Sequence, residues 1–358
     1  MGAPAHFPAR LAPGRALRVS AVSAEILSTH TPALLAAAVE CAAARLRAGE
    51  VVGVPTETVY GLAANALDPA AVARIYALKG RPSHNPIIVH VASPAMARAC
   101  ATAWPAAADR LAAAFWPGPL TLVLPKAGVI PDIVTAGGTT VGIRWPQHPF
   151  MQALIRTCDF PLAAPSANLA NRLSPTNASH VARQLGDRLS LIVDGGDSNV
   201  GIESTVVDLT GSSPRILRPG MIHEPAILAA IGGACLESDG SAQAAGPLRS
   251  PGLLQKHYSP RARLVVLRWA DEDQLLTELT RLGANLERTC VLAHSRIPLG
   301  GRLPHVHVIP DDAEAFARGL YGELHGCDDQ GAEWIVVEEL PDSPEWSGIA
   351  DRLRRAAA

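Results

Sequence analysis

An apolar stripe at helical spacing begins shortly after residue 30. Thr31 and Pro32 precede the stripe and Gly49 follows it. Its members are Leu34, Leu35, Val39 and Leu46. Threonine before proline is typical of a helix start, and glycine is typical of a helix end. The sequence therefore predicts a helix between Thr31 and Gly49.

A second helix is predicted from Asp68-Pro69 to Gly80, with Lys79 in its last turn. Beyond it, short apolar runs alternate with further helical patterns. Strands are predicted at residues 51–54, 86–91, 120–124, 139–145, 162–164, 191–193, 205–209, 263–267, 289–293 and 334–337. Strands that alternate with helices indicate an α/β fold, with a small parallel sheet after residue 260.

The composition divides the chain into parts. Residues 1–30 hold arginines among Ala and Pro without a continuous apolar core, so we expect a disordered extension rather than a signal peptide. Residues 237–260 are rich in Gly, Ser, Ala and Pro and lack periodicity, which is typical of a linker. Two domains are therefore expected, at residues 31–236 and 261–358.

The net charge and its distribution along the chain limit which classes of function the sequence supports. The chain has 358 residues, of which 48% are hydrophobic, enough for sizeable globular cores. A net charge of −2 argues against a protein that binds polyanions over its whole surface. Residues 51–220 carry 13 Lys and Arg against 10 Asp and Glu, whereas residues 261–358 carry 11 against 17. The first part is the expected host for phosphate groups.

Several common signatures are absent from the sequence. The six cysteines are far apart and form no C-x-x-C pair, which predicts a reduced, cytoplasmic protein without a cysteine metal site. No apolar run reaches the ~18 residues that a membrane span requires. The phosphate loop G-x-x-x-x-G-K-[ST] and the dinucleotide fingerprint G-x-G-x-x-G do not occur. A nucleotide would need a different cradle.

Two cations, Lys79 and Arg81, stand at the predicted end of the second helix. On residue type alone, such cations offset the helix dipole by ~0.3–1 kcal/mol. They can equally bind phosphate oxygens, with Arg81 as a fork and Lys79 as a point charge. Both interpretations stay open at this level.

Other polar groups have similar alternatives. Ser166 and Asn168 follow a strand, where an ordinary turn is the simpler interpretation. Arg144 lies in an otherwise apolar strand, and a half-buried guanidinium needs a partner, which a bound carboxylate or phosphate would supply. A single histidine, as at His90 or His257, is more often a structural residue than a ligand or base.

Eight short motifs occur in one order along the chain. They are Pro55–Leu62, Lys79–Pro82 with Asn85–Pro86 and His90, Trp116–Thr121, Val141–Pro146, Ala164–Asn168, Ser174–Thr176, Glu203–Val206 and Leu217–Gly220. With them the sequence strongly resembles the threonylcarbamoyl-adenylate synthase family, which has a YrdC-like fold. The resemblance covers residues from about 33 to 222. The linker and a Rossmann-like tail match the family's long, two-domain form.

The resemblance implies a fold and a reaction. The first domain is expected to be a twisted α/β domain with a large concave cavity, and the second a smaller Rossmann-like parallel-sheet domain. The enzyme would combine L-threonine, bicarbonate and ATP into threonylcarbamoyl-adenylate and pyrophosphate, as a nucleotidyltransferase. Mg²⁺ would be held through the ATP phosphates. A tRNA threonylcarbamoyl transferase complex would receive the product, for the adenosine beside the anticodon, and weak RNA binding stays open.

The resemblance also implies roles for single residues. The signature pairs, assigned as catalytic, are Lys79 with Arg81 and Ser166 with Asn168, on opposite sides of the nucleotide. Expected ATP contacts are Arg81, Asn85, Thr140, Ser166, Ser174, Arg218 and, from the linker, Tyr258 with or without His257. The expected threonine pocket consists of Thr58, Tyr60, His90, Arg144 and Ser204. No protein-bound metal is expected.

Two rival functions remain. One is carbamoyl transfer from carbamoyl phosphate, as in a related fold used for hydrogenase maturation, but those proteins carry zinc-finger and acylphosphatase-like regions that this sequence lacks. The other is a module that binds double-stranded RNA or tRNA. The sequence offers no basic and aromatic stripe for it, and the C-terminal part is acidic.

Overall fold

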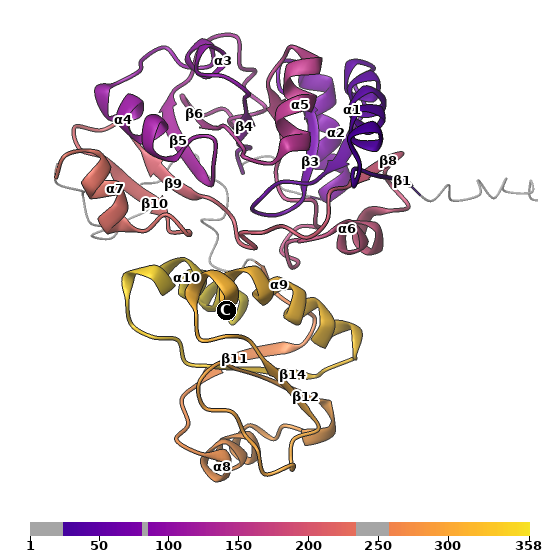
Figure 1. Cartoon of the computed structure of the whole chain (residues 1–358), viewed down its shortest axis with the longest axis vertical. Helices are drawn as coiled ribbons and strands as arrows, with labels where there is room; N and C mark the ends of the chain where they lie inside the picture. The colour runs from indigo at the N-terminus through magenta and orange to yellow at the C-terminus, as the bar shows by residue number, and fades with distance from the viewer. Residues whose placement is uncertain (1–23, 81–84, 234–257) are drawn as a thin grey trace, which may run out of the picture.

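The computed structural model describes residues 24–80, 85–233 and 258–358. Within these ranges the chain forms two domains, each built on its own sheet (Figure 1). The N-terminal domain holds a ten-stranded mixed sheet and the C-terminal domain a four-stranded one. The predicted α/β class is confirmed. No described helix is long and apolar enough to cross a membrane.

The ten strands of the first sheet do not follow chain order. From one edge to the other they are β1 (Glu25–Ser28), β8 (Leu191–Asp194), β2 (Val52–Val54), β3 (Gly61–Asn65), β7 (Leu162–Ala163), β4 (Val89–His90), β6 (Thr140–Arg144), β5 (Leu120–Pro125), β9 (Thr205–Asp208) and β10 (Arg215–Arg218). Parallel and antiparallel pairs both occur, so the sheet is mixed. Segments far apart in sequence thus become neighbours at its centre.

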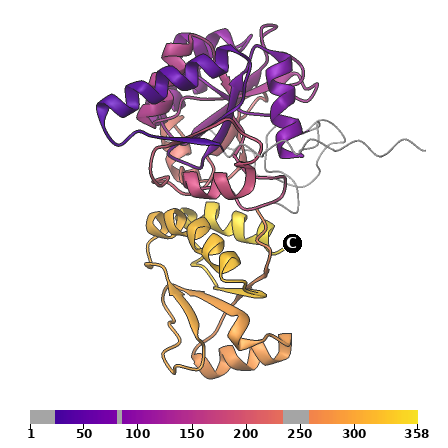
Figure 2. The same cartoon turned by 90° about the vertical axis from the view of Figure 1, so that its right-hand side faces the viewer.

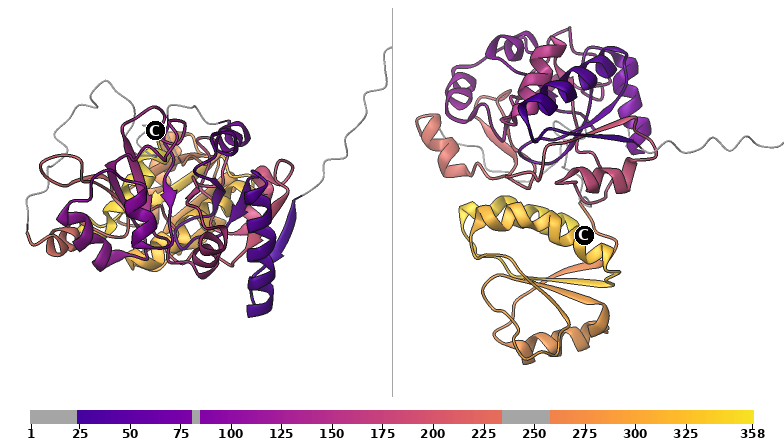
Figure 3. Two further views of the ribbon diagram at one scale, coloured as in Figure 1. Left: turned by 90° about the horizontal axis from the view of Figure 1, so that it is seen from above. Right: turned by 45° about the vertical axis from the view of Figure 1, so that its right-hand side comes forward.

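Helices cover both faces of this sheet because its strands carry apolar side chains on both sides. On β8, for example, Leu191 and Val193 pack with α1 (Pro32–Arg47) and α5 (Pro149–Cys158), whereas Ile192 faces the opposite core. That second core is closed by α2 (Pro69–Lys79), α3 (Pro94–Ala99), α4 (Ala106–Phe115), α6 (Ala178–Leu185) and α7 (Glu224–Ala230). Figure 3 shows α1 beside β1 at one edge of the domain.

Helix α2 has the ends that the sequence predicts. The carboxylate of Asp68 accepts the N–H of Ala70 at 2.8 Å, and Pro69 occupies the first turn. Gly80 ends the helix with φ +58, a left-handed conformation that favours glycine. Lys79 is consequently the last helical residue, and it is buried.

The C-terminal sheet is parallel throughout, as predicted. Its order is β11 (Arg263–Leu267), β14 (Trp334–Glu338), β12 (Thr289–Ala293) and β13 (His305–Val308). Helix α8 (Glu272–Leu282) packs on one face, and α9 (Ala313–Asp329) and α10 (Ser347–Ala356) pack on the other. Figures 1 and 2 show α9 and α10 between this sheet and the N-terminal domain.

The two domains share one apolar core. Ile202 of the N-terminal domain packs in the same cluster as Phe316 and Leu320 of α9. The backbones also approach closely, since a Cβ added to Gly201, whose φ is +84, would lie 2.3 Å from the carbonyl oxygen of Ala317. A side chain at this position would therefore push α9 away from the N-terminal domain.

Some elements differ from the sequence prediction. Residues 25–28, assigned to a disordered extension, form β1 and pair in parallel with β8. This strand is short and half exposed at a sheet edge, so it leaves no apolar signal. Strand β3 was missed because Gly-Leu-Ala-Ala-Asn lacks β-branched residues. The segments β10, β13, α7 and α10 were missed as well. Most of the predicted linker lies outside the described residues.

Candidate active site

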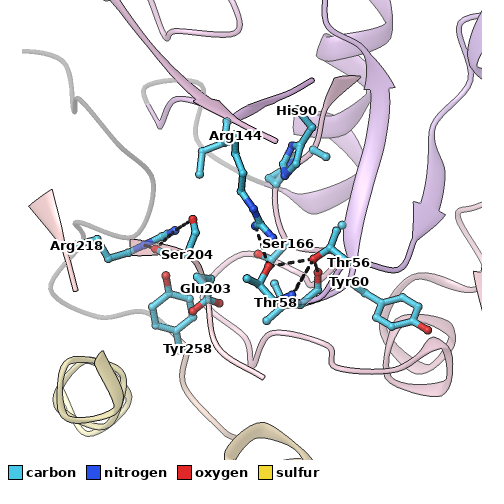
Figure 4. A pocket seen from close by; sticks show the side chains of 15 residues that line it. Thr56, Thr58, Tyr60, His90, Arg144, Ser166, Glu203, Ser204, Arg218 and Tyr258 are labelled. Atoms are coloured by element: carbon cyan, nitrogen blue, oxygen red, sulfur yellow. Dashed lines mark hydrogen bonds between the residues drawn. The ribbon is translucent and has the colours of Figure 1, made fainter. Parts of the chain in front are cut away.

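One pocket gathers many of the residues that the sequence analysis singled out (Figure 4). Its walls come from the β2–β3 loop, β4, β6, β10, the segment after β7 and the segment before β9, with one residue, Tyr258, from the end of the predicted linker. The labelled lining residues are Thr56, Thr58, Tyr60, His90, Arg144, Ser166, Glu203, Ser204, Arg218 and Tyr258.

Strand register explains how the pocket forms. His90 of β4 lies opposite Arg144 of β6, and Arg144 lies opposite Thr121 of β5. The hydroxyl of Thr121 lies 2.8 Å from that of Ser204, which directly precedes β9. Polar side chains from three neighbouring strands, and from the residue just before a fourth, therefore meet at one end of these strands inside the sheet.

Arg144 has a protein partner that the sequence analysis did not identify. Its Nη2 lies 2.8 Å from Oε1 of Glu57, and both side chains are almost completely buried. Burial acts to raise the pKa of the Glu57 carboxyl, but Arg144 and the backbone N–H of Gln147 outweigh it and hold the pKa below its usual value. The buried guanidinium thus has a charge partner within the protein, although Nη2 and both oxygens of Glu57 make no hydrogen bond of normal geometry with the described residues.

Thr58 holds a second nitrogen of the Arg144 guanidinium. Arg144 Nη1 donates to Thr58 Oγ1 at 2.8 Å, and Nε donates to the carbonyl of Gly118 at 3.3 Å. Thr56 in turn orders the loop, because its hydroxyl donates to the carbonyl of Val59 at 2.6 Å and lies 3.0 Å from the hydroxyl of Thr58. The orientation of Arg144 is set before any ligand binds.

His90 contributes a neutral ring beside this cation. Burial and, secondarily, the charge of Arg144 lower the pKa of His90 to about 3. Its Nδ1 makes no hydrogen bond of normal geometry with the described residues. A buried polar atom of this kind is expected to find a partner in a ligand or in water.

Lys79 and the Ser166–Asn168 segment are in direct contact. Lys79 Nζ donates to the carbonyl of Ser166, to the carbonyl of Asn168 at 2.6 Å and to Asn168 Oδ1 at 2.9 Å. Ser166 Oγ donates to the same Oδ1 at 2.6 Å, and the Asn168 amide donates to the carbonyl of Arg172. These signature residues were expected on opposite sides of a nucleotide. The structure instead joins Lys79, Ser166 and Asn168 in one hydrogen-bond network.

Ser204 and Arg218 form another fixed pair on the pocket wall. Arg218 donates from Nε to the carbonyl of Ser204 at 3.1 Å, and from Nη2 to the same carbonyl at 3.0 Å and to Ser204 Oγ at 3.2 Å. Burial lowers the pKa of Arg218, although the group stays a cation at neutral pH. The pair therefore brings a buried positive charge to the wall opposite His90 (Figure 4).

Glu203 connects the pocket to the C-terminal domain. Its Oε1 accepts the hydroxyl of Ser174 at 2.5 Å, while Oε2 accepts Nε of Arg352 at 2.7 Å and the hydroxyl of Tyr321 at 3.2 Å. Arg352 and Tyr321 come from α10 and α9. Neither was found from the sequence, since they lie far from every motif. The predicted ATP ligand Ser174 thus directs its hydroxyl at Glu203.

Tyr258 lies at the junction of the two domains. Its ring packs beneath the guanidinium of Arg352, whose carbon is 5.5 Å from the ring centroid, and it tilts against Tyr321. The residue is buried and has φ +61. Burial raises the pKa of its hydroxyl. The end of the predicted linker therefore contributes directly to the pocket.

Not all predicted residues face the pocket with their functional groups. The Tyr60 hydroxyl points away, donating to the carbonyl of Gly196 and accepting the N–H of Gly195 (Figure 4). Thr140 begins β6, at the opposite end of that strand from Arg144. Asn85 is buried, and its carbonyl accepts the hydroxyl of Tyr76. Arg81 and His257 lie outside the described residues.

The described lining offers little for direct metal coordination. Glu203 is its one carboxylate, and Arg352, Ser174 and Tyr321 already hold it. Glu57, just behind the wall, is paired with Arg144. Mg²⁺ prefers carboxylates, phosphates and water, so these residues fit an ion held by a ligand's phosphates rather than by the protein.

The comparisons with known proteins cover both domains. Residues 44–220 match a family model described as "Telomere recombination", and residues 222–358 match one described as "Threonylcarbamoyl-AMP synthase, C-terminal domain". Threonylcarbamoyl-AMP synthase of Bacillus subtilis is 41% identical over 340 residues, covering 92% of this chain and 94% of the relative. The enzyme of that name from Pyrococcus abyssi is 37% identical over 323 residues, covering 89% and 94%.

A solved structure extends the similarity to three dimensions. The crystal structure of P. abyssi Sua5 complexed with L-threonine matches with a TM-score of 0.83 and 35% identity, over 93% of this chain and 96% of that one. Fold and pocket thus define a two-domain α/β protein with a buried, arginine-lined site. The chain belongs to the threonylcarbamoyl-AMP synthase family, in its form with a C-terminal domain.

Proposed function

We propose that this chain is an L-threonylcarbamoyladenylate synthase, which forms threonylcarbamoyl-AMP and pyrophosphate from L-threonine, bicarbonate and ATP. Its family membership supports the reaction. The observation that carries the proposal is the oriented guanidinium of Arg144, which shares a pocket with Thr58, neutral His90 and Ser204. The similar P. abyssi protein has been crystallised with L-threonine.

Threonine binding rests on Arg144 and its neighbours. A carboxylate that meets a fixed guanidinium gains charge-assisted hydrogen bonds without the loss of side-chain freedom that a mobile arginine would incur. Thr58 and Ser204 place hydroxyls beside it, and His90 supplies a ring nitrogen without adding charge. Glu57 keeps the site close to electroneutral before threonine enters.

ATP is assigned to the neighbouring cations. Arg218, with Ser166 and Tyr258, lines the same pocket, so a triphosphate here lies within reach of the threonine site. Arg81 and Asn85 are proposed on the triphosphate and Thr140 as a further contact, as the family resemblance implies. Ser174 and Lys79 act indirectly, by positioning other residues. The Ser174 hydroxyl holds Glu203, and the Lys79 ammonium holds the Ser166–Asn168 segment. Mg²⁺ bound by the phosphates would help to neutralise the developing charge.

The chemistry requires positioning more than covalent catalysis. The amine of threonine attacks bicarbonate with loss of water, or its dehydrated form, CO₂, with loss of a proton, and either route gives a carbamate. A carbamate oxygen then attacks the α-phosphorus of ATP in line, and pyrophosphate leaves. A buried pocket shields the hydrolysable carbamate from water. The class is nucleotidyl transfer, and the product would pass to a tRNA threonylcarbamoyl transferase complex.

Pyrophosphate release provides the test. Release from ATP is expected to require threonine and bicarbonate together, and omission of threonine is the decisive control. Release that depends on carbamoyl phosphate but not on threonine would favour the carbamoyl-transfer rival. RNA binding with a steep salt dependence, and no threonine-dependent ATP consumption, would favour the RNA-binding rival.

A further inference from the structure

The C-terminal domain contains a cluster of ligand-type side chains remote from every motif. The sulfur atoms of Cys290 and Cys327 and a ring nitrogen of His307 all lie within 4.8 Å of one another. Both cysteines are buried, and His307 is one-fifth exposed. The sequence predicts no cysteine metal site, because no motif joins these residues. The fold brings them together from β12, β13 and α9.

Strand register places these side chains on one face of the sheet. Parallel pairing sets Cys290 opposite His305 and Leu292 opposite His307, and residues two apart on a strand share a face. Cys290 and Leu292 belong to the core shared with α9, so His307 points toward that helix as well. Two strands and a helix therefore meet at the cluster.

A carboxylate fixes the orientation of the histidine. Oε2 of Glu323 lies 2.7 Å from Nδ1 of His307, and Glu323 precedes Cys327 by one turn of α9. With Nδ1 engaged, Nε2 is the nitrogen left for the sulfur atoms. In a metal-bound histidine, one ring nitrogen usually binds the metal while the N–H of the other ring nitrogen donates a hydrogen bond to a carboxylate.

The distances suit a small tetrahedral ion. Zinc bonds of about 2.3 Å to sulfur imply sulfur–sulfur separations of roughly 3.8 Å in a tetrahedral site. Atoms already within 4.8 Å need only small side-chain rotations to reach this geometry. The donor types also fit, because two cysteine sulfur atoms and one imidazole nitrogen are ligands that zinc commonly takes in proteins.

We propose that Cys290, His307 and Cys327 bind one Zn²⁺ ion, through two sulfur atoms and Nε2, with water completing the tetrahedron. This donor set is typical of zinc, whereas the harder Mg²⁺ and Ca²⁺ prefer oxygen. The ion would cross-link β12, β13 and α9. Helix α9 also carries Tyr321, which holds Glu203 of the pocket, so the ion stabilises the helix on which the domain contact depends.

Metal binding by the full-length protein tests this directly. The protein is reduced, any bound metal is removed with a chelator, and the protein is dialysed against ZnCl₂. Bound zinc is then measured by elemental mass spectrometry. About one equivalent per chain is expected. CoCl₂ in place of ZnCl₂ is expected to give the near-ultraviolet thiolate-to-cobalt band and the visible bands of tetrahedral cobalt. Neither readout depends on synthase activity, so failure here is distinct from failure of the proposed function.

Variants separate this site from adventitious binding. Cys290→Ser and His307→Ala are expected to lose the bound ion, and Glu323→Gln to weaken its affinity about 10- to 100-fold. His307 and Glu323 are partly exposed, so these two variants keep the test valid even where Cys290→Ser does not fold. Cys158→Ser, at a buried cysteine of the N-terminal domain, is the matched control and should bind normally.

Three outcomes would overturn the proposal. The first is a folded, reduced wild-type protein that binds no zinc. The second is unchanged zinc content in His307→Ala. The third is a Cys290–Cys327 disulfide found by peptide mass spectrometry that persists under mild reduction and excludes the ion.

Discussion

Arg352 of α10 donates its Nε–H to Oε2 of Glu203 at 2.7 Å, across the boundary between the two domains. The side chains are 1% and 8% exposed, so the pair is desolvated. Burial acts to lower the pKa of Arg352, but Glu203, Tyr258 and Asp351 raise it above its usual value, while the pKa of Glu203 is held low. Glu203 lines the pocket, so the C-terminal domain takes part in building the site.

Arg352→Ala is expected to destabilise the protein by about 3–5 kcal/mol, because it leaves the buried carboxylate of Glu203 without its cation. Urea unfolding followed by circular dichroism measures the change. Arg354→Ala is the matched control, since Arg354 pairs with Asp351 but is 73% exposed. Its effect should be only ~0–1 kcal/mol. Equal effects of the two substitutions would refute the buried bridge.

Arg144→Lys is expected to weaken threonine binding about 10- to 100-fold, because lysine keeps the charge opposite Glu57 but loses the planar fork. Isothermal calorimetry with L-threonine provides the affinity. Arg156→Lys, on the exposed part of α5, serves as the control and should bind as the wild type does. Normal threonine affinity in Arg144→Lys would remove Arg144 from the proposed site.

Lys79→Met is expected to lower both stability and synthase activity. The substitution strips the carbonyls of Ser166 and Asn168 of a buried donor, which costs about 1–3 kcal/mol. Thermal unfolding and pyrophosphate release report the two losses. Lys126→Met changes a lysine that pairs with exposed Asp132, so it should leave both nearly unchanged. A stable but inactive Lys79→Met would indicate instead that Lys79 acts on the substrate directly.

The free energy of unfolding is expected to fall in acid. His90 has a folded pKa of about 3 against the ordinary 6.5, so between these values the unfolded chain binds a proton that the folded chain does not. Stability due to neutral His90 is present above pH 6.5 and is lost as the pH falls toward 3. The lowered pKa values of Glu57 and Glu203 act in the same direction, below the ordinary carboxyl pKa of 4.5.

His90→Gln isolates this contribution. The variant should flatten the dependence of unfolding free energy on pH by about 1.4 kcal/mol per pH unit between pH 6 and 4. Urea titrations at a series of pH values measure the slope. His30→Gln, at an exposed position, should leave the slope as in the wild type. An unchanged slope in His90→Gln would mean that His90 is protonated in the folded protein.

Local signals in the sequence predicted the elements that have clear ends. Asp68, Pro69 and Gly80 set the bounds of α2, because each fits one position of a helix terminus. The β3 segment has no such signal, since its small residues are tolerated as a strand only between β2 and β7. Tertiary context, rather than propensity, determines that strand.

The site shows a similar division. The motifs identified Thr58, His90, Arg144 and Ser204, and the structure places all four around one pocket. The partner of Arg144, Glu57, was visible in its motif but could not be assigned without the strand register. Arg352 and the cluster of Cys290, His307 and Cys327 have no local signature, because their neighbours come from distant parts of the chain.

Product identification tests the central claim most directly. The full-length protein is incubated with ATP, L-threonine, Mg²⁺ and ¹³C-labelled bicarbonate, and the nucleotides are analysed by mass spectrometry. The account predicts threonylcarbamoyl-AMP carrying the labelled carbon, with product absent when threonine is omitted and greatly reduced in Arg144→Lys. ATP consumption without a labelled adenylate, or a labelled product that forms without threonine, would contradict it.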